Sequence, residues 1–136
     1  MDKFAKCPCD SKLLYSKCCK QYHDGQLPRS AETLMRSRYC AYALGLSDYI
    51  MDTTHSAHPE FSTDRNRWRS EIQTFIDHTR FHQLKILDFR DGETISTVEF
   101  VAYLRQADRD ATFTEISTFE KVDGKWLYKS GEILRD

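Results

Sequence analysis

A dense cluster of cysteines near the amino terminus constrains the fold of this chain more than any other stretch. Four of its five cysteines fall within CPCDSKLLYSKCC, residues 7–19, as one pair separated by a single residue and one adjacent pair. Cysteines packed this closely in a short segment indicate that their sulfurs bond something, either another sulfur or a metal ion. The choice between these two bonds decides how the segment folds.

A metal ion suits this spacing better than disulfides do. A bridge within either pair would close a small strained ring, because bridged Cα atoms normally lie about 4.4–6.8 Å apart; bridges between the pairs, and unligated thiols, stay open as alternatives. The chain begins MDKFAK, without an apolar signal-peptide core, which predicts a reducing, cytoplasmic location. Reduced thiolates favour a tetrahedral zinc site. We therefore predict one structural zinc ion bound by Cys7, Cys9, Cys18 and Cys19.

The segment between the two cysteine pairs has the composition of a short helix. Asp10 and Ser11 are typical N-cap residues, and Lys12 to Lys17 could form one or two helical turns that return the second pair toward the first. A zinc ion held by four thiolates has no free position for water. The cluster therefore predicts a scaffold and not a hydrolytic centre.

The cysteine spacing, with Ser11 and Tyr15 between the pairs, resembles the SEC-C motif, best known from the C-terminal tail of the preprotein translocase ATPase SecA. That motif usually has Gly-Ser-Gly after its second cysteine, whereas this chain has Asp10, Ser11 and Lys12. Proteins such as the chaperone SecB, and the ribosome, are docking partners of SEC-C motifs. The resemblance therefore implies a protein partner.

Three strings further along the chain, ETLMRSRY, AYALG and DYI, resemble the YchJ-like family of small bacterial proteins. The resemblance implies a SEC-C zinc knuckle over residues 1–22, called the knuckle below, and a domain similar to nuclear transport factor 2 over residues 23–136. Longer relatives carry a second SEC-C motif at the carboxyl end, which is not found here up to Asp136.

Composition narrows the function classes. At 136 residues the chain is expected to form one compact unit. Its 20 Lys and Arg against 21 Asp and Glu argue against a general nucleic-acid-binding surface, which normally carries a basic excess. No apolar run approaches the roughly eighteen residues of a membrane span. The lysines Lys12, Lys17 and Lys20 would steer the knuckle toward an acidic partner, or would simply keep it soluble.

The hydrophobic period changes along the chain. Three amphipathic helices are expected over about 31–44, 47–53 and 65–78, with Ser30 and Asp64 as caps of the first and third. From Phe81 onward the period becomes two, with hairpin turns at 91–92 and 123–124. This order predicts an α+β fold with three N-terminal helices packed on a curved four-stranded antiparallel sheet, a nuclear transport factor 2-like or cystatin-like cone preceded by the knuckle.

The cone would contain a pocket. If the concave face of the sheet includes Glu99 with Tyr103, and Glu115 with Ser117, two carboxylates point into partly apolar space. Arginines of the first helix would then pair with them, and the loop residue His55 is a candidate for proton transfer. The pocket candidates are Glu115, Glu99, Ser117, Tyr103, Arg36, Arg38 and His55.

Other positions have plainer interpretations. Cys40 lies within the first predicted helix and is expected to be a small core residue. The row Ser96, Val98 and Phe100 is apolar enough to mediate pairing if it lies on the convex face of the sheet, so the oligomeric state stays open.

Two function classes follow from these patterns. The first is a non-catalytic binding or adaptor module built on a structural zinc knuckle. The second is a small enzyme of the isomerase or dehydratase kind, or a small-molecule-binding protein, that uses the cone pocket with Glu99, Glu115 or His55. Only fold analogy supports the enzyme.

Overall fold

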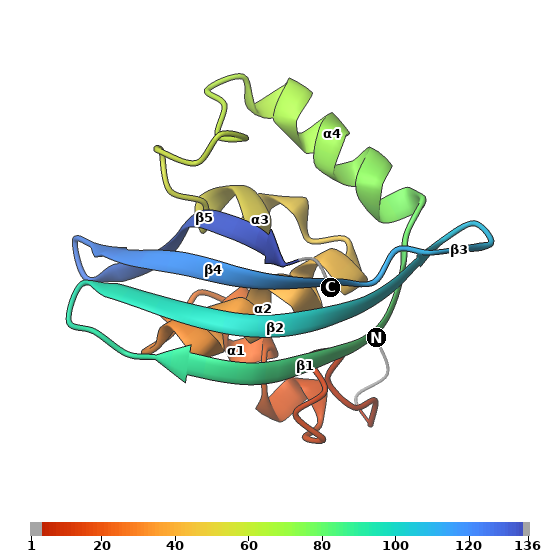
Figure 1. Ribbon diagram of the computed structural model, residues 1–136, viewed down its shortest axis with the longest axis horizontal. Helices are drawn as coiled ribbons and strands as arrows, with labels where there is room; N and C mark the ends of the chain where they lie inside the picture. Colours follow the sequence, from red (N-terminus) through yellow and green to blue (C-terminus); the bar gives the residue numbers. More distant parts are fainter. Residues whose placement is uncertain (1–3, 135–136) are drawn as a thin grey trace.

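The computed structural model describes residues 4–134, and it contains the three helices that the sequence predicted. They are α2 (Ala31–Leu44), α3 (Ser47–Asp52) and α4 (Arg65–Asp77), shown in Figure 1. The Ser30 hydroxyl accepts a hydrogen bond from the Thr33 amide, and the Asp64 carboxylate accepts one from Arg67. Both predicted N-caps are therefore confirmed, and each satisfies one backbone donor that the helix leaves free.

The second half of the chain forms an antiparallel meander. Its long strands are β1 (Arg80–Arg90), β2 (Ile95–Gln106), β4 (Phe113–Val122) and β5 (Lys125–Leu134), in the order β1-β2-β4-β5, and the two-residue β3 (Arg109–Asp110) pairs with the end of β2. All neighbours in this sheet are antiparallel. The predicted α+β class with a curved sheet is confirmed.

The turn of the β4–β5 hairpin could be predicted from the sequence because of the backbone conformation that it requires. Asp123 and Gly124 have φ values of 51° and 81°, the left-handed conformation that a tight hairpin requires at both central positions. Glycine adopts it without strain and aspartate tolerates it better than most residues. The same residue types predicted the turn.

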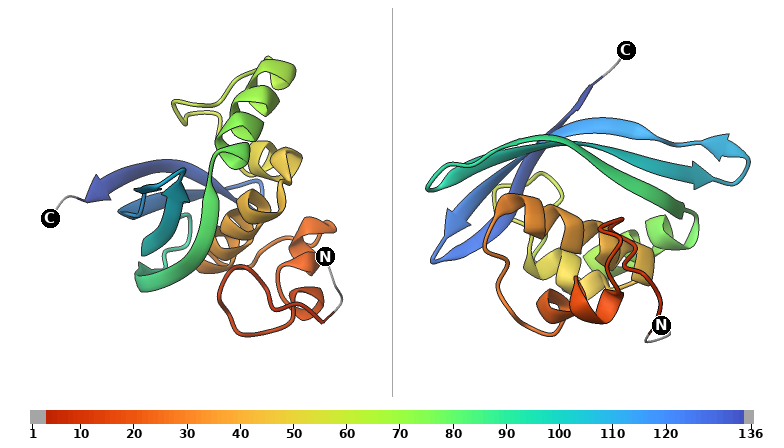
Figure 2. Two further views of the ribbon diagram at one scale, coloured as in Figure 1. Left: turned by 90° about the vertical axis from the view of Figure 1, so that its right-hand side faces the viewer. Right: turned by 90° about the horizontal axis from the view of Figure 1, so that it is seen from below.

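The molecule has three layers (Figure 2). The sheet curves over α2 and α3, and the knuckle lies on the side of α2 that faces away from the sheet. The largest apolar cluster lies between α2 and the concave face, and a second joins α2, α3 and α4. The thiols form a third cluster, which shares no residue with the other two.

Burial along β2 identifies its concave side and corrects one expectation. Val98, Phe100 and Leu104 are buried against the helices, while Glu99 and Tyr103 lie on the convex face. Glu99 and Tyr103 therefore do not line the pocket. The row Ser96, Val98 and Phe100, considered above as a convex pairing surface, belongs to the concave side, so it cannot mediate pairing.

The knuckle also departs from its predicted local structure. The expected helix over 12–17 shrinks to the 3₁₀ turn η1 (Tyr15–Lys17), and a short helix α1 (Lys20–His23) follows, which was not predicted. Asp10 and Lys12 have φ values of 65° and 74°, which no right-handed helix allows. These are the two positions where the usual SEC-C motif has glycine, so this chain keeps the glycine-like backbone without the glycines.

No helix within residues 4–134 combines the length and the apolar character needed to cross a lipid bilayer.

Candidate metal centre and pocket

The structure brings together the four cysteines that the sequence predicted as ligands. Their Sγ atoms all lie within 4.8 Å of one another, and the pairs Cys9–Cys18 and Cys18–Cys19 are 3.6 and 4.0 Å apart. Four thiolates bound tetrahedrally to zinc at 2.3 Å would be separated by about 3.8 Å. All the thiols are free, so no disulfide joins them. The donor set and its spacing fit a tetrahedral metal ion.

Burial and hydrogen bonding both favour a closed site. Cys7, Cys9 and Cys19 are at most 4% exposed, and Cys18 is half-buried. The Ser11 hydroxyl lies 3.2 Å from the Cys18 sulfur, where it can donate to a thiolate. Side-chain hydrogen bonds from Cys19, and then from Cys40 and Cys9, lower the pKa of Cys7 far below that of a free thiol. Hydrogen bonds within the same cluster and burial raise the pKa of Cys19, and the pKa of Cys9 is raised as well. Ionisation of the whole set therefore needs a cation to offset the charge of the neighbouring thiolates.

Cys40 is the fifth thiol of this cluster. It is fully buried, as predicted for a core residue, but its Sγ atom lies 3.7 Å from that of Cys7. It belongs to α2, whereas the other four belong to the knuckle. The helix therefore supplies part of the wall around the candidate metal site.

Two further residues hold the knuckle on α2. Arg36 donates from Nη1 to the Cys9 carbonyl at 2.8 Å and from Nε to Glu32 at 3.1 Å. The ring of His23 lies between Tyr15 Oη, at 2.7 Å from Nδ1, and the Ser37 carbonyl, at 2.8 Å from Nε2. Arg36 was predicted in the pocket, and this prediction is wrong because the residue faces the knuckle side of the helix.

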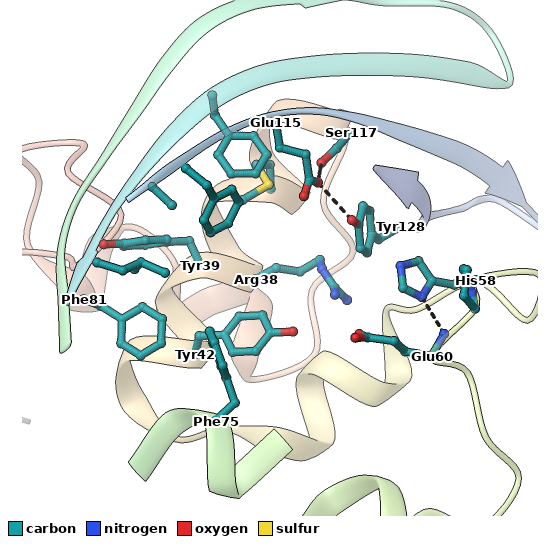
Figure 3. A pocket seen from close by; sticks show the side chains of 16 residues that line it. Arg38, Tyr39, Tyr42, His58, Glu60, Phe75, Phe81, Glu115, Ser117 and Tyr128 are labelled. Carbon is teal, nitrogen blue, oxygen red and sulfur yellow. Dashed lines mark hydrogen bonds between the residues drawn. The ribbon is translucent and has the colours of Figure 1, made fainter. Parts of the chain in front are cut away.

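A cavity of about 400 Å³ lies between the concave face of the sheet, α2, α4 and the loop at 58–60 (Figure 3). Most of its wall is apolar, and much of it is aromatic. The apolar side chains include Phe75, Phe81, Phe100, Leu104 and Phe113. Its size is at the lower end of the range typical of small-molecule sites, which is roughly 300–1,000 Å³.

One end of the cavity is polar and is built around Glu115. The carboxylate atom Oε2 accepts hydrogen bonds from the Ser117 hydroxyl and, at 2.9 Å, from Tyr128 Oη. Glu115 is 9% exposed and Ser117 is fully buried. Glu115 and Ser117 therefore lie where the sequence predicted.

Arg38 also lines the cavity as predicted, but it does not pair with Glu115 in the described residues. Its Nη1 atom donates to the Ile50 carbonyl at 2.9 Å and to the hydroxyls of Thr53 and Thr54 at 2.7 and 3.1 Å. The guanidinium carbon lies 4.8 Å from the centre of the Tyr128 ring. Tyr128 thus joins the two charged groups, with the cation on its face and the carboxylate on its hydroxyl.

His55 does not line the cavity, contrary to its prediction. Its Nε2 atom lies 2.6 Å from Glu120, and its amide donates to the Tyr128 carbonyl at 2.8 Å. His58, three residues later, lines the cavity in its place. Burial lowers the pKa of His58, so its ring is neutral near pH 7, and its Nδ1 accepts a hydrogen bond from the amide of Glu60 at 3.0 Å.

Sequence reasoning missed four polar residues of the cavity wall: Tyr39, Tyr42, Glu60 and Tyr128. Tyr128 was the easiest of them to predict, because the two-residue period of a strand places it on the same face as Trp126. The loop residue Glu60 carried no periodic signal.

The family model described as the middle domain of YchJ, similar to nuclear transport factor 2, matches residues 30–131. The chain belongs to the YchJ-like family. A UPF0225 protein of Corynebacterium efficiens is 36% identical over 132 residues, covering 94% of this chain and 93% of that protein. A UPF0225 protein of Streptomyces coelicolor is 37% identical over 129 residues, covering 94% and 95% of the two chains.

Two solved structures resemble this chain over nearly its whole length, which includes both the knuckle and the domain. The solution structure of a SEC-C motif containing protein from Rhodopseudomonas palustris has a TM-score of 0.80 at 32% identity and covers 95% of this chain and 98% of that one. A crystal structure of a SEC-C motif protein from Psychrobacter arcticus has a TM-score of 0.76 at 27% identity, with coverages of 98% and 85%. These neighbours support a SEC-C metal site in this YchJ-like protein.

Proposed function

We propose that this YchJ-like protein is a non-catalytic binding protein whose knuckle is shaped by one structural zinc ion. The observation that carries the proposal is the approach of four thiol sulfurs to within 4.8 Å, three of them buried. Four thiolates saturate a tetrahedral zinc ion and leave no position for water or substrate. Zinc bound here would therefore fix the shape of the knuckle and perform no hydrolysis.

The outer side of the knuckle is the surface that we propose for partner binding. Leu13 is 55% exposed, and the side chains of its neighbour Lys12 and of Lys17, four residues later, are exposed as well. Lys12 also forms an ion pair with Asp10 at 2.9 Å. An exposed apolar side chain among lysines suits a protein with an acidic surface. The SEC-C resemblance adds SecB and the ribosome as examples of the partner class, met in the cytoplasm.

Metal analysis and affinity capture test both parts of this proposal. We expect one zinc per chain in the intact protein and in the Cys40→Ala variant, and none in a Cys9→Ser, Cys18→Ser double variant. Capture from bacterial cytosol should recover an acidic partner with the intact protein and lose it with the double variant. A Lys12→Glu, Lys17→Glu variant should keep zinc and lose the partner. A folded knuckle without metal, or capture indifferent to both changes, would contradict us.

A second candidate function is small-molecule binding, which the aromatic cavity with its single polar end favours. Small-molecule sites are typically apolar pockets with a few convergent polar groups. Of the three side chains first considered for catalysis, only Glu115 lies in the cavity, because Glu99 and His55 lie elsewhere. We therefore propose binding there, without a reaction.

A further inference from the structure

The polar end of the cavity contains enough uncommitted hydrogen-bonding groups to define a ligand class, an inference that rests on the second candidate function above. The first group is Arg38. Its residue is only 5% exposed, and within the described residues it forms no ion pair. A buried guanidinium with only neutral acceptors lacks the anion that usually compensates its desolvation.

The direction of the Arg38 hydrogen bonds shows which edge remains for a ligand. All three leave from Nη1, toward Ile50 and the hydroxyls of Thr53 and Thr54. The Nη2 and Nε atoms form the other edge of the guanidinium, a planar fork that matches the two oxygens of a carboxylate. The Tyr42 hydroxyl, a neutral group, lies beside this guanidinium. In Figure 3 the side chain points into the cavity, toward the space between Tyr128 and Glu60.

The second group is Glu115. Both of its hydrogen bonds, from Ser117 and Tyr128, are received by Oε2, so Oε1 has an acceptor site left for a donor. The Glu115 carboxylate would repel a ligand carboxylate unless the ligand also presents a hydroxyl or amino hydrogen to Oε1.

The rest of the wall requires an apolar body. Phe75 and Phe81 lie at one side of the cavity, and Phe100 and Phe113 lie within 6.0 Å of each other, centre to centre, on the sheet. Aromatic side chains of this kind pack well against a ring or a branched aliphatic group.

We propose that the cavity binds a small carboxylic acid with an apolar, preferably aromatic, body and a hydroxyl or amino donor beside the carboxylate. The carboxylate binds the free edge of Arg38, the donor faces Glu115 Oε1, and the body packs among the phenylalanines.

Three related probes test the ligand class by calorimetry: 3-phenyllactate, 3-phenylpropionate, which lacks the hydroxyl, and 3-phenyl-1-propanol, which lacks both that hydroxyl and the carboxylate. We expect phenyllactate to bind at least about tenfold more tightly than the propanol, because a charge-assisted bidentate contact contributes on that order. Phenylpropionate should fall between them. Amide shifts in nuclear magnetic resonance spectra should map all binding to the cavity, at residues such as Ala102 and Phe113.

Two variants test which residues bind the carboxylate and the hydroxyl of the ligand. Arg38→Lys keeps the charge and removes the fork, so it should reduce binding of both acids about tenfold and leave the propanol unchanged. Because Arg38 also holds the end of α3, Glu115→Gln provides a second variant that does not depend on that contact. It should narrow the ratio between phenyllactate and phenylpropionate, while the matched Glu99→Gln change on the convex face should leave this ratio unaltered.

The outcomes separate the ligand class from the small-molecule proposal. Equal binding of all three probes in the cavity, or a ratio that Glu115→Gln does not change, would overturn the ligand class and leave small-molecule binding standing. No binding of any probe at millimolar concentration would overturn both.

Discussion

At the scale of single residues, Gly131 shows how a missing side chain shapes the candidate pocket. It pairs with Ser117 across the sheet, on the concave side. A Cβ atom at this position would lie 2.5 Å from both the Tyr128 hydroxyl and the Glu115 carboxyl carbon. The pair Glu115–Tyr128 can therefore form only because residue 131 has no side chain.

Replacing this glycine should disturb the polar end of the cavity directly. Gly131→Ala should lower the free energy of unfolding by about 1–3 kcal/mol, the usual cost of an extra methyl group in a packed site. Urea denaturation measures this change. Ser130→Ala, one residue away and exposed on the opposite face, should stay within about 0.5 kcal/mol of the parent. If both variants unfold at the same urea concentration as the parent, the glycine does not serve this purpose.

Sequence patterns predicted single residues well where chemistry was local and poorly where it depended on strand orientation. The spacing of the four cysteines was enough to bring them together, because a short loop can return the second pair to the first. The sequence did not show which face of β2 packs on the helices, because Val101 and Tyr103 make its outer face nearly as apolar as its inner face. The errors at Glu99 and Tyr103 follow from that ambiguity.

At the scale of elements, α2 is the surface on which both the sheet and the knuckle pack. One side of it carries Leu34 and Tyr39 into the main core, and the other carries Cys40 against the thiols. Its bounds agree with the residue types at its two ends, because Ser30 caps the start and Gly45 adopts the left-handed conformation that ends the helix. Its second role was not predicted, because a lone cysteine in a helix gives no sign of what packs on it.

The contact of His23 with α2 should make knuckle docking sensitive to pH. Its Nε2 donates to the Ser37 carbonyl, so Nδ1 is the acceptor for the Tyr15 hydroxyl and the ring is neutral. Burial lowers the pKa of His23 below its usual 6.5. A lowered histidine pKa means that the folded state favours the neutral ring. The stability is complete above about pH 6.5 and declines as the pH falls through the lowered pKa.

A His23→Gln variant isolates this contribution, since an amide can donate and accept in the same two directions but does not titrate here. We expect the free energy of unfolding of the parent, measured at matched zinc concentration, to fall more steeply between pH 7.5 and 5.5 than that of the variant. Acid release of zinc affects both proteins equally and cancels in the comparison. Identical slopes would show that His23 does not control the docking.

At the scale of the whole molecule, the three apolar clusters predict which parts depend on metal. The thiol cluster is joined to the remainder chiefly through Cys40, Arg36 and His23, and by an exposed hydrogen bond between Gln83 of β1 and Asp10. The two larger clusters contain the inner face of the sheet and the buried sides of α2, α3 and α4. The meander itself was predictable from its hairpin turns, but this separation of clusters was not, because it depends on which side of α2 each segment covers.

Removal of zinc should therefore unfold the knuckle and leave the cone intact. With a strong chelator, amide hydrogen exchange should lose protection over residues 5–24, and Cys40 should become reactive toward a thiol reagent, because its cover is gone. Protection in β2 and β4 should persist, since their partners in the sheet and in α2 do not include the thiols. Re-addition of zinc should restore both signals. Loss of protection throughout the sheet at the same chelator concentration would mean instead that knuckle and cone fold as one cooperative unit, with the metal stabilising the whole chain.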